Sequence, residues 1–371
     1  MNPFNKPYLS GKELHYIEDA VKRGKLSGDG YYTKKCHDFF ITNYGVKKVL
    51  LTTSCTDALE MASLLLDIKP GDEVIMPSYT FVSTANAFEL RGATIKFVDS
   101  RKDHPGMDEQ LIASLITPKT KAIVVVHYAG VACNMDVIKE LANKHDLFVV
   151  EDAAQAIDSY YKGKPLGSIG HLGTFSFHET KNIQCGEGGL LMINDNRFVK
   201  RAEILWEKGT NRSAFFRGEI DKYGWVDVGS SFLPSELNAA YLFAQLESLK
   251  NIQEQRKNLW QHYFESLTEW TKANQIQLPF VPNFATNNGH MFYLICKNSE
   301  QRAQLIAYLK NQNILSVFHY ISLHSSPYFL NKHDGRILPM SEVYTDRLLR
   351  LPMYYELDVN HVINVLLSYG E

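Results

Sequence analysis

The sequence has few cysteines, and they follow no disulfide or metal-binding pattern. Cys36, Cys55, Cys133, Cys185 and Cys296 are odd in number, widely scattered and never spaced as C-x-x-C. This distribution argues against a disulfide framework and against a zinc or iron–sulfur cluster. We therefore predict reduced thiols and no metal site.

Long apolar runs and clusters of one charge are also missing. No stretch reaches the ~18 consecutive apolar residues of a membrane span, and residues 1–9 lack the basic and apolar regions of a signal peptide. The formal net charge is −2, from 39 basic and 41 acidic side chains mixed along the chain, which leaves no polybasic arm. We expect a cytoplasmic protein that binds neither nucleic acid nor membrane and captures any anionic ligand locally.

Short apolar runs alternate with helical patterns from Lys48 to about Asn194, as expected of a mostly parallel sheet covered by helices. The length of 371 residues suits about two domains. The strand candidates are residues 49–51, 73–76, 95–98, 122–126, 148–150, 173–177 and 189–193. We predict an α/β fold with a doubly wound domain of about seven strands.

Helical spacing of apolar residues recurs between these strands, at 56–66, 83–90 and 135–144. After a loop-rich stretch, a long helical pattern begins at Ser235 and runs towards Leu267 as a connector. Short strands and helices follow, at 291–295, 301–311, 316–319 and 359–369. We predict a large α/β domain over residues 1–245, with its N-terminal segment packed on the small domain. The connector helix and a smaller α+β domain span residues 246–371.

Side chains that can bind or react with a ligand follow four of the predicted strands, at the edge where ligands bind in open α/β sheets. They are Ser54-Cys55-Thr56 after 49–51, Phe81 after 73–76, Asp152 after 148–150, and Ser176 and Lys181 at and beyond 173–177. Because the carboxyl ends of parallel strands meet at one edge, these groups are expected to converge on one ligand.

Asp152 and Lys181 each have a functional and a structural interpretation. A carboxylate at the end of a buried strand is costly to ionise unless a cation, such as a protonated pyridine nitrogen, meets it; alternatively Asp152 is a helix N-cap. A lysine amine forms an imine with an aldehyde when burial or nearby positive charge lowers its pKa. A loop lysine such as Lys181 is otherwise an ordinary surface residue.

Ser54, Cys55 and Thr56 stand where a helix would begin, so free N–H groups and hydroxyls would favour a phosphate there. A plain N-cap is the compatible alternative. Phe81 is placed to stack on a flat ring, although an aromatic residue after a strand also suits the core.

The order of phosphate loop, aromatic residue, Asp, Ser and Lys resembles the fold-type I pyridoxal-phosphate (PLP) enzymes. More narrowly, residues 150–155 (VEDAAQ), 176–182 (SFHETKN) and 186–189 (GEGG) resemble the nucleotide-sugar aminotransferases of the DegT/DnrJ/EryC1/StrS type. Further runs resemble the branch that uses dTDP-4-keto-6-deoxyglucose, at 77–88, 127–133, 208–213, 215–218, 318–320 and 323–324. The resemblance covers about residues 2–355, with 325–342 divergent.

This resemblance implies a PLP-dependent aminotransferase and a homodimer whose active sites lie at the interface. Lys181 would hold PLP as a Schiff base and, once displaced by L-glutamate, move a proton between the donor carbon and the cofactor. The implied cofactor-binding residues are Ser54, Cys55, Thr56, Phe81, Asp152, Gln155 near the ring oxygen, Ser176, Lys181 and Ser231. The candidates around the nucleotide sugar are Asn211, Arg212, Arg217, His319 and Tyr320, where arginines suit a diphosphate.

One run departs from the family pattern. Many members carry Asn-Tyr-Arg before the connector helix, with the Asn reaching the partner subunit's cofactor phosphate, whereas residues 229–233 here read GSSFL. The Ser231 hydroxyl would have to take that role. His178 is a candidate helper in proton transfer, or a packed histidine.

The expected reaction is amination at C4 of dTDP-4-keto-6-deoxyglucose, giving a dTDP-4-amino-4,6-dideoxy sugar for an O-antigen type surface polysaccharide. A 3-keto sugar substrate is the alternative within the transferases. Related sugar dehydratases replace the lysine with histidine, and a non-catalytic scaffold should have lost Asp152 or Lys181; both residues are present. The axial or equatorial configuration of the new amine is open.

Overall fold

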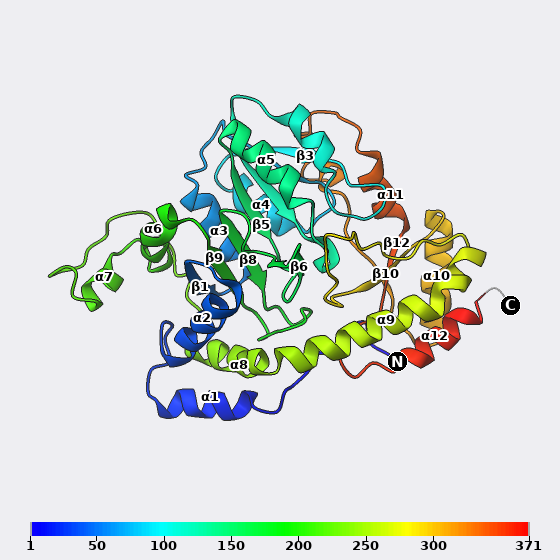
Figure 1. Cartoon of the computed structure of the whole chain (residues 1–371), viewed down its shortest axis with the longest axis horizontal. Coiled ribbons are helices and arrows are strands. Elements are labelled where there is room, and N and C mark those ends of the chain that lie inside the picture. Colours follow the sequence, from blue (N-terminus) through cyan, green and yellow to red (C-terminus); the bar gives the residue numbers. More distant parts are fainter. Residues whose placement is uncertain (1, 370–371) are drawn as a thin grey trace.

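Seven strands form one mostly parallel sheet at the centre of the molecule (Figure 1), in a computed structural model that describes residues 2–369. The strands, in sheet order, are β1 (Lys48–Thr52), β9 (Gly189–Ile193), β8 (Leu172–Ser176), β5 (Phe148–Asp152), β4 (Thr120–Val126), β2 (Glu73–Pro77) and β3 (Thr94–Val98). All neighbours from β8 to β3 pair in parallel, and β9 is antiparallel to both β1 and β8. The predicted seven-stranded, mostly parallel sheet is confirmed.

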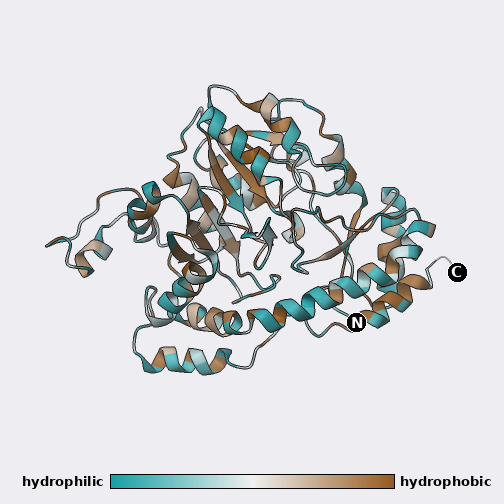
Figure 2. Ribbon diagram, in the orientation of Figure 1, coloured by the Kyte–Doolittle hydropathy of each residue, from teal (hydrophilic) through white to brown (hydrophobic). Residues whose placement is uncertain are grey.

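Both faces of this sheet are covered by helices, because successive strand residues point to opposite sides. Val49 and Leu51 belong to a hydrophobic cluster with α2 (Tyr31–Tyr44), α5 (Met135–His145) and α8 (Glu236–Glu247). Leu50 belongs to a second cluster with α3 (Cys55–Leu65), α4 (Val82–Glu89) and α6 (Asn196–Trp206). Figure 2 shows the hydrophobic strands between these helices. The predicted helices at 56–66, 83–90 and 135–144 correspond to α3, α4 and α5.

The connector consists of two helices instead of the single helix expected from the sequence. Helix α8 begins after Ser235, whose hydroxyl caps it by accepting from the N–H of Asn238, and ends at Glu247. Ser248 has a ψ of 3°, which leaves the helical path, and α9 (Leu249–Ala273) then continues. The pair runs below the sheet towards the C-terminal part of the chain (Figure 1).

The C-terminal part has its own small sheet and its own core. Its antiparallel strands, in sheet order, are β10 (Phe292–Ile295), β12 (Leu348–Leu351) and β11 (Val317–Phe318). Its helices are α10 (Ser299–Asn311), η3 (Leu323–Ser325), α11 (Pro339–Arg347) and α12 (Val359–Leu367). Tyr263, Phe292, Leu305 and Val362 share a hydrophobic cluster that is separate from the two around the large sheet. The α+β character is as predicted, and the domain boundary near residue 245 stays a prediction.

The remaining elements lie around this framework. They are α1 (Glu13–Lys22), η1 (Glu109–Leu115), η2 (Tyr128–Gly130), β6 (Tyr160–Tyr161), β7 (Lys164–Pro165) and α7 (Arg212–Phe216). The N-terminal segment packs on the C-terminal part, where Asn2 bridges to Ile314 and the Tyr8 ring stacks on Tyr355 at 3.9 Å.

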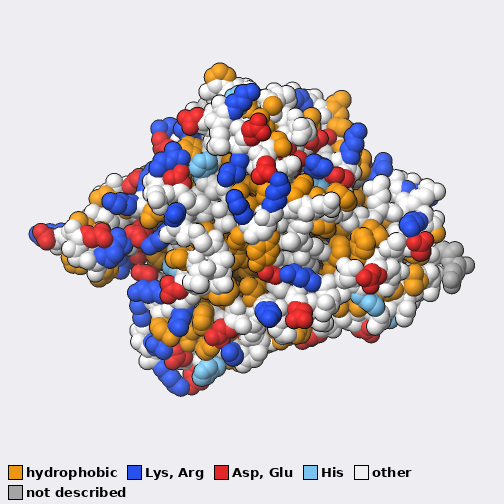
Figure 3. Space-filling model, viewed as in Figure 1, with side chains coloured by type: hydrophobic (Ala, Val, Ile, Leu, Met, Phe, Trp, Pro, Cys, Tyr) orange, Lys and Arg blue, Asp and Glu red, His pale blue; other side chains and the backbone are white. Residues whose placement is uncertain are grey.

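An arm around α7 stands away from the body of the molecule (Figure 1). It spans residues 208–231, and its large aromatic side chains are exposed, with Phe216 at 70% and Trp225 at 83%. Charged side chains of both signs lie among them (Figure 3). Over the described residues, no helix combines the length and the apolar character needed to cross a membrane.

Candidate active site

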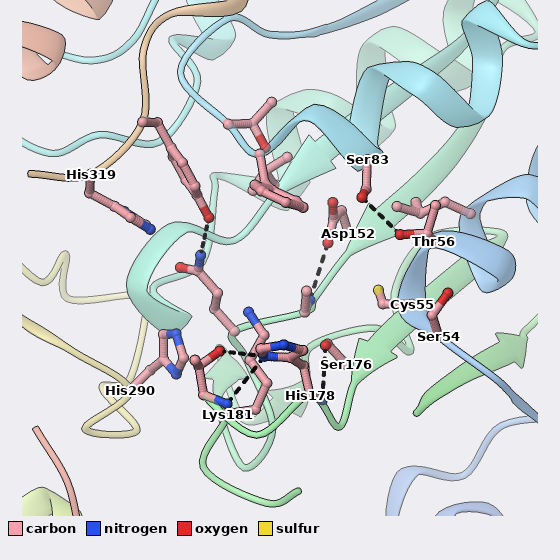
Figure 4. Close-up of a pocket in the computed structure, with 18 of the residues that line it drawn as sticks. Ser54, Cys55, Thr56, Ser83, Asp152, Ser176, His178, Lys181, His290 and His319 are labelled. Carbon is pink, nitrogen blue, oxygen red and sulfur yellow. Dashed lines mark hydrogen bonds between the residues drawn. The ribbon is translucent and has the colours of Figure 1, made fainter. Parts of the chain in front are cut away.

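A cavity of about 530 Å³ opens beside the carboxyl ends of β5 and β8 (Figure 4). Its wall contains these residues predicted from the sequence: Ser54, Cys55, Thr56, Phe81, Asp152, Gln155, Ser176, Lys181, His319 and Tyr320. They come from elements far apart in the chain, which the sheet topology brings together. In Figure 4, Lys181, His178 and His290 stand on one side of the cavity and Ser54, Cys55 and Thr56 on another.

The N-terminus of α3 forms the polar end of this cavity. Ser54 is the N-cap, and its hydroxyl accepts from the N–H of Asp57 at 3.1 Å. The Thr56 hydroxyl lies 2.8 Å from that of Ser83 on α4. N-cap and phosphate-binding interpretations are compatible here, because the helix dipole and the remaining N–H groups still favour an anion.

Gly189 is required for this loop to approach the sheet. A Cβ on Gly189 would lie 2.2 Å from the carbonyl carbon and oxygen of Ser54 and 2.4 Å from the nitrogen of Cys55. Such distances are far inside van der Waals contact, so a larger residue would push the loop outward. The lack of a side chain at Gly189 thus allows the α3 N-terminus to lie this close to β9.

Asp152 is the last residue of β5 and is buried, with its carboxylate held on both oxygens. Oδ2 accepts from the Thr84 hydroxyl at 2.7 Å, and Oδ1 accepts from the N–H of Ala154 at 3.2 Å. Burial raises the pKa of Asp152, and these two hydrogen bonds together with the Lys181 charge oppose the rise. A cation bound in the cavity would restore the ionised form.

Lys181 lies in the loop between β8 and β9, with its side chain in the cavity. Burial lowers its pKa, and the nearby Arg350 charge lowers it further, while Cys55 and Asp152 oppose the shift. A lysine with a lowered pKa has a larger neutral fraction and is a better nucleophile towards an aldehyde. The ordinary surface interpretation of Lys181 does not fit this position.

Gln155, His319 and Tyr320 form one connected part of the cavity wall. The Gln155 carboxamide accepts from the N–H of Ala129 at 2.6 Å and donates to the Tyr320 hydroxyl at 3.0 Å. His319 Nδ1 lies 2.6 Å from the Tyr128 hydroxyl, and its ring stacks on that of Tyr320. Tyr320 has a φ of 55°, a strained value for a bulky residue that the surrounding contacts hold in place.

Phe81 is 55% exposed, which does not suit the core interpretation of this residue. Its ring lies at the cavity with its centroid 6.0 Å from that of Tyr320. An exposed aromatic face at a cavity wall is suited to stacking on a flat ligand.

The other four predicted residues lie outside this cavity within their own chain. Arg212 and Ser231 line a second cavity of about 590 Å³, together with Lys25, Lys34 and Lys208. Asn211 accepts from the N–H of Gly224 through its side chain, and Arg217 pairs with Glu203 and Glu219.

A model of the DegT/DnrJ/EryC1/StrS aminotransferase family matches residues 7–368. The chain belongs to this family. Among solved structures, the aminotransferase TlmJ from Streptoalloteichus hindustanus is 27% identical with a TM-score of 0.91, over 99% of this chain and 98% of that chain. DesV from S. venezuelae is 29% identical with a TM-score of 0.89, over 100% and 98%. Spr1654 from Streptococcus pneumoniae, described as a sugar aminotransferase in its PMP form, is 25% identical with a TM-score of 0.91, over 99% and 98%.

This DegT-family aminotransferase is PLP-dependent, as is the family, and Spr1654 was solved in a PLP form as well. The residues of the cavity fit that cofactor. Within residues 2–369 no lysine or arginine forms an ion pair with the buried Asp152, so this carboxylate suits a cationic ring nitrogen. The α3 N-terminus suits a phosphate, and Lys181 suits an aldehyde.

Sequence reasoning missed several residues of this aminotransferase's cavity. Ser83 of the cavity wall and Thr84, which holds Asp152, lie inside the 77–88 run, but neither was singled out, because hydroxyls on a helix are common. Arg350 and His290 come from the C-terminal part, more than 100 residues after Lys181, and no local pattern marks them. The rim residue His178 lies 3.6 Å from Glu187 through Nε2 and 2.9 Å from the Thr180 hydroxyl through Nδ1, so it is not a packed core histidine.

Proposed function

We propose that this aminotransferase transfers an amino group from L-glutamate to C4 of dTDP-4-keto-6-deoxyglucose. The observation that carries the transfer itself is the meeting of Lys181, Asp152 and the α3 N-terminus in one cavity. Each group is ambiguous alone, but only a ligand with an aldehyde, a ring nitrogen and a phosphate uses all three.

Bound PLP would supply an electron sink that stabilises negative charge on the donor carbon. Asp152, held by Thr84 and Ala154, would keep a bound ring nitrogen protonated. Ser54, Cys55, Thr56 and Ser176 would hold the phosphate, and Phe81 would contact the flat ring. Lys181 would hold the aldehyde and, once free, would be the base that moves the donor's proton.

The sugar substrate is supported by the chain's resemblance to the 4-keto-sugar branch at 77–88, 127–133 and 318–320. The runs 77–88 and 318–320 line the cavity, and all three contact one another: Tyr79 donates to the His319 carbonyl, and Tyr128 contacts the His319 ring. The solved relatives described as sugar aminotransferases agree with a sugar acceptor. The position of the ketone rests on the resemblance alone.

We further propose a homodimer with shared active sites. Arg212 and Ser231 sit with three lysines in the second cavity, outside the cavity of Lys181. They can serve a phosphate or diphosphate at the active site if the second cavity of one subunit faces the Lys181 cavity of its partner. The arm with its exposed Phe216 and Trp225 lies beside them and offers apolar surface to a second copy.

The cytoplasmic location and the use of the product in an O-antigen type polysaccharide stay predictions from the sequence. The expectation that the protein binds no nucleic acid, membrane or metal also stays a prediction.

Incubation with L-glutamate, PLP and dTDP-4-keto-6-deoxyglucose tests the proposed reaction. We expect 2-oxoglutarate and a dTDP-4-amino-4,6-dideoxyhexose, identified by mass and by proton couplings at C4. Product from the 3-keto isomer alone would overturn the position assignment. A deoxygenated sugar without an amine would indicate a dehydratase instead.

A further inference from the structure

The imidazole ring of His290 lines the Lys181 cavity. His290 lies just before β10, so it enters the cavity from the C-terminal part of the chain. The residue is buried, and in Figure 4 its ring stands on the same side of the cavity as Lys181. Which of its two ring nitrogens carries the proton decides what this ring can bind.

The hydrogen bonds of Asn182 fix the position of that proton. The Asn182 carboxamide nitrogen donates to the Asn288 backbone carbonyl at 2.9 Å and to the Gln253 side-chain oxygen at 2.8 Å. Because a backbone carbonyl only accepts, the atom of Asn182 that faces it must be the nitrogen. The Asn182 oxygen therefore faces His290, 2.8 Å from Nδ1, and Nδ1 must be the nitrogen that carries the proton and donates.

The other ring nitrogen, Nε2, is a hydrogen-bond acceptor as long as the ring is neutral. Within residues 2–369 no hydrogen bond of this nitrogen is found, although the residue lines the cavity. Burial lowers the pKa of His290 well below its ordinary value, and the charges of Lys181 and Arg350 lower it further. The ring is therefore neutral at physiological pH and offers one lone pair to a ligand.

The other two histidines of the cavity wall do not offer such an acceptor in the described part of the chain. Nδ1 of His178 accepts from the N–H of Thr180 at 3.3 Å, so its Nε2 carries the proton. Nδ1 of His319 lies 2.6 Å from the Tyr128 hydroxyl, which can either donate or accept, so its tautomer is not fixed. His290 is thus the histidine whose free nitrogen is defined as an acceptor.

We propose that His290 Nε2 accepts a hydrogen bond from a ring hydroxyl of the keto sugar, with Asn182 as the residue that positions the imidazole proton. This inference rests on the proposed aminotransferase function and adds a residue that selects the sugar. The 4-keto sugar carries hydroxyls at C2 and C3, and each can donate. In glutamate the only donor group is the amine that reacts, and its carboxylates only accept, so they gain nothing from a lone pair.

This difference between the two substrates makes the contact specific to one half-reaction. A sugar that lacks the hydroxyl leaves the buried Nε2 unpaired, and an unpaired buried group costs binding free energy. The half-reaction with glutamate does not use the contact. A purely structural role of His290 would affect both half-reactions.

Binding of sugars that cannot react is the first test. dTDP-4,6-dideoxyglucose has neither a ketone nor a hydroxyl at C4, and calorimetric titration of the PLP-loaded protein compares it with its 2-deoxy and 3-deoxy forms. In the wild type, one of the two deletions should raise the dissociation constant by about 3- to 10-fold, the equivalent of one hydrogen bond. In His290→Phe the same deletion should have no effect, because the contact is already lost. A wild type that tolerates both deletions, or an equal effect in His290→Phe, would overturn the inference.

Two further variants separate the contact from a general loss of structure. His290→Gln can donate to Asn182 and still present an oxygen to the sugar, so it should restore part of the discrimination. His262→Phe is the matched control. His262 also contacts an asparagine oxygen, Asn360 Oδ1 at 2.8 Å, but it is exposed and lies outside the cavity wall. This control should discriminate between the sugars as the wild type does.

Nitrogen-15 spectra of histidine-labelled protein test the role of Asn182, with the His290 signals assigned by their absence in His290→Phe. The wild type should carry the His290 proton on Nδ1. Asn182→Leu should lose this preference and discriminate less between the sugars. A wild-type proton on Nε2 would contradict the assignment of this nitrogen as an acceptor.

Single-turnover half-reactions complete the test. With His290→Phe, amination of the keto sugar by protein loaded with pyridoxamine phosphate should slow by about 3- to 10-fold, and conversion by L-glutamate should stay within about twofold of wild type. Equal loss in both half-reactions, or loss with glutamate alone, would overturn the sugar contact. A wild type that takes up PLP but performs neither half-reaction would instead count against the proposed function.

Discussion

Burial acts in opposite directions on the two ionisable groups at the centre of the cavity. It raises the pKa of Asp152 and lowers the pKa of Lys181, so both groups are driven towards their neutral forms. A neutral amine is what an aldehyde needs, whereas a neutral carboxyl is useless for holding a proton on a ring nitrogen. The Thr84 hydroxyl and the Lys181 charge offset the effect of burial on Asp152 only in part, and a protonated ring nitrogen beside it would favour the ionised carboxylate further.

Asp152→Asn separates catalysis from folding. The amide retains the shape of the carboxyl and can still accept from Thr84, so the fold should persist. Turnover with L-glutamate should fall by roughly 10- to 100-fold, the equivalent of losing a hydrogen bond to a charged group. The measurements are steady-state rates and thermal unfolding of the same preparations. If stability and turnover fell equally, the role of Asp152 would be that of a helix cap and not of a cofactor-binding residue.

The pH dependence of stability in the cofactor-free protein follows from the raised pKa of Asp152. The Asp152 carboxyl binds its proton more tightly in the folded state than in the unfolded state. Its contribution to the free energy of unfolding is therefore lost as pH rises from the unfolded pKa through the folded pKa. Below about pH 4, cofactor-free Asp152→Asn should have the same stability as the wild type. Above that pH, it should become more stable relative to the wild type. Melting temperatures over a pH series measure this difference. A difference that shrinks with rising pH would contradict the account.

Residues next to strand ends could be predicted from the sequence, because strand ends are marked by apolar runs and the chemistry of Asp152 and Lys181 is distinctive. Arg350 could not be predicted in this way. Its place in the wall of the Lys181 cavity depends on how the small sheet packs against the large one, which no local sequence pattern shows.

At the scale of elements, the α3 N-terminus depends on its close approach to β9. Gly189→Ala would place a methyl group 2.2 Å from the Ser54 carbonyl. We expect the overpacking to cost about 1–3 kcal/mol and to weaken PLP binding, because the loop must shift outward. Thermal unfolding and PLP titration check this.

Gly224→Ala is the control for this substitution. A Cβ at Gly224 meets nothing within 4 Å, and its φ is outside the left-handed region. The control should match wild type in both measurements, and a Gly189→Ala protein that also matches it would show that the loop does not need the close contact.

The elements themselves were predictable where burial is uniform. Strands β2 and β9 are short apolar runs with every residue buried, and such runs are the signal from which they were predicted. The break between α8 and α9 was not predictable, since Ser248 stands inside an uninterrupted helical pattern and a single serine does not mark a boundary.

At the scale of the whole molecule, twelve of the predicted site residues are divided between two cavities of one chain, ten in the first and Arg212 and Ser231 in the second, while Asn211 and Arg217 line neither. The resemblance implies roles for residues of both cavities in one site, and sequence periodicity contains no information on a second copy that could bring them together. The shared-site proposal follows from this division.

Subunit complementation tests the shared site. Lys181→Ala and Arg212→Ala should each be inactive or strongly impaired alone. Mixed and refolded together, they should regain up to about a quarter of wild-type activity, because half of the dimers are hybrids with one intact site. Recovery should be absent when Lys181→Ala is mixed with Asp152→Asn, since both lesions lie in the same cavity. No recovery in the first mixture would contradict sharing.

Reduction of the PLP-loaded protein with borohydride, followed by peptide mapping, tests the central claim most directly. The account predicts a visible absorption band in the wild type, and after reduction a cofactor adduct on the peptide containing Lys181. Lys181→Ala should lack both, while still folding. A colourless wild type, or an adduct on another lysine only, would contradict the assignment of Lys181 as the residue that holds the cofactor.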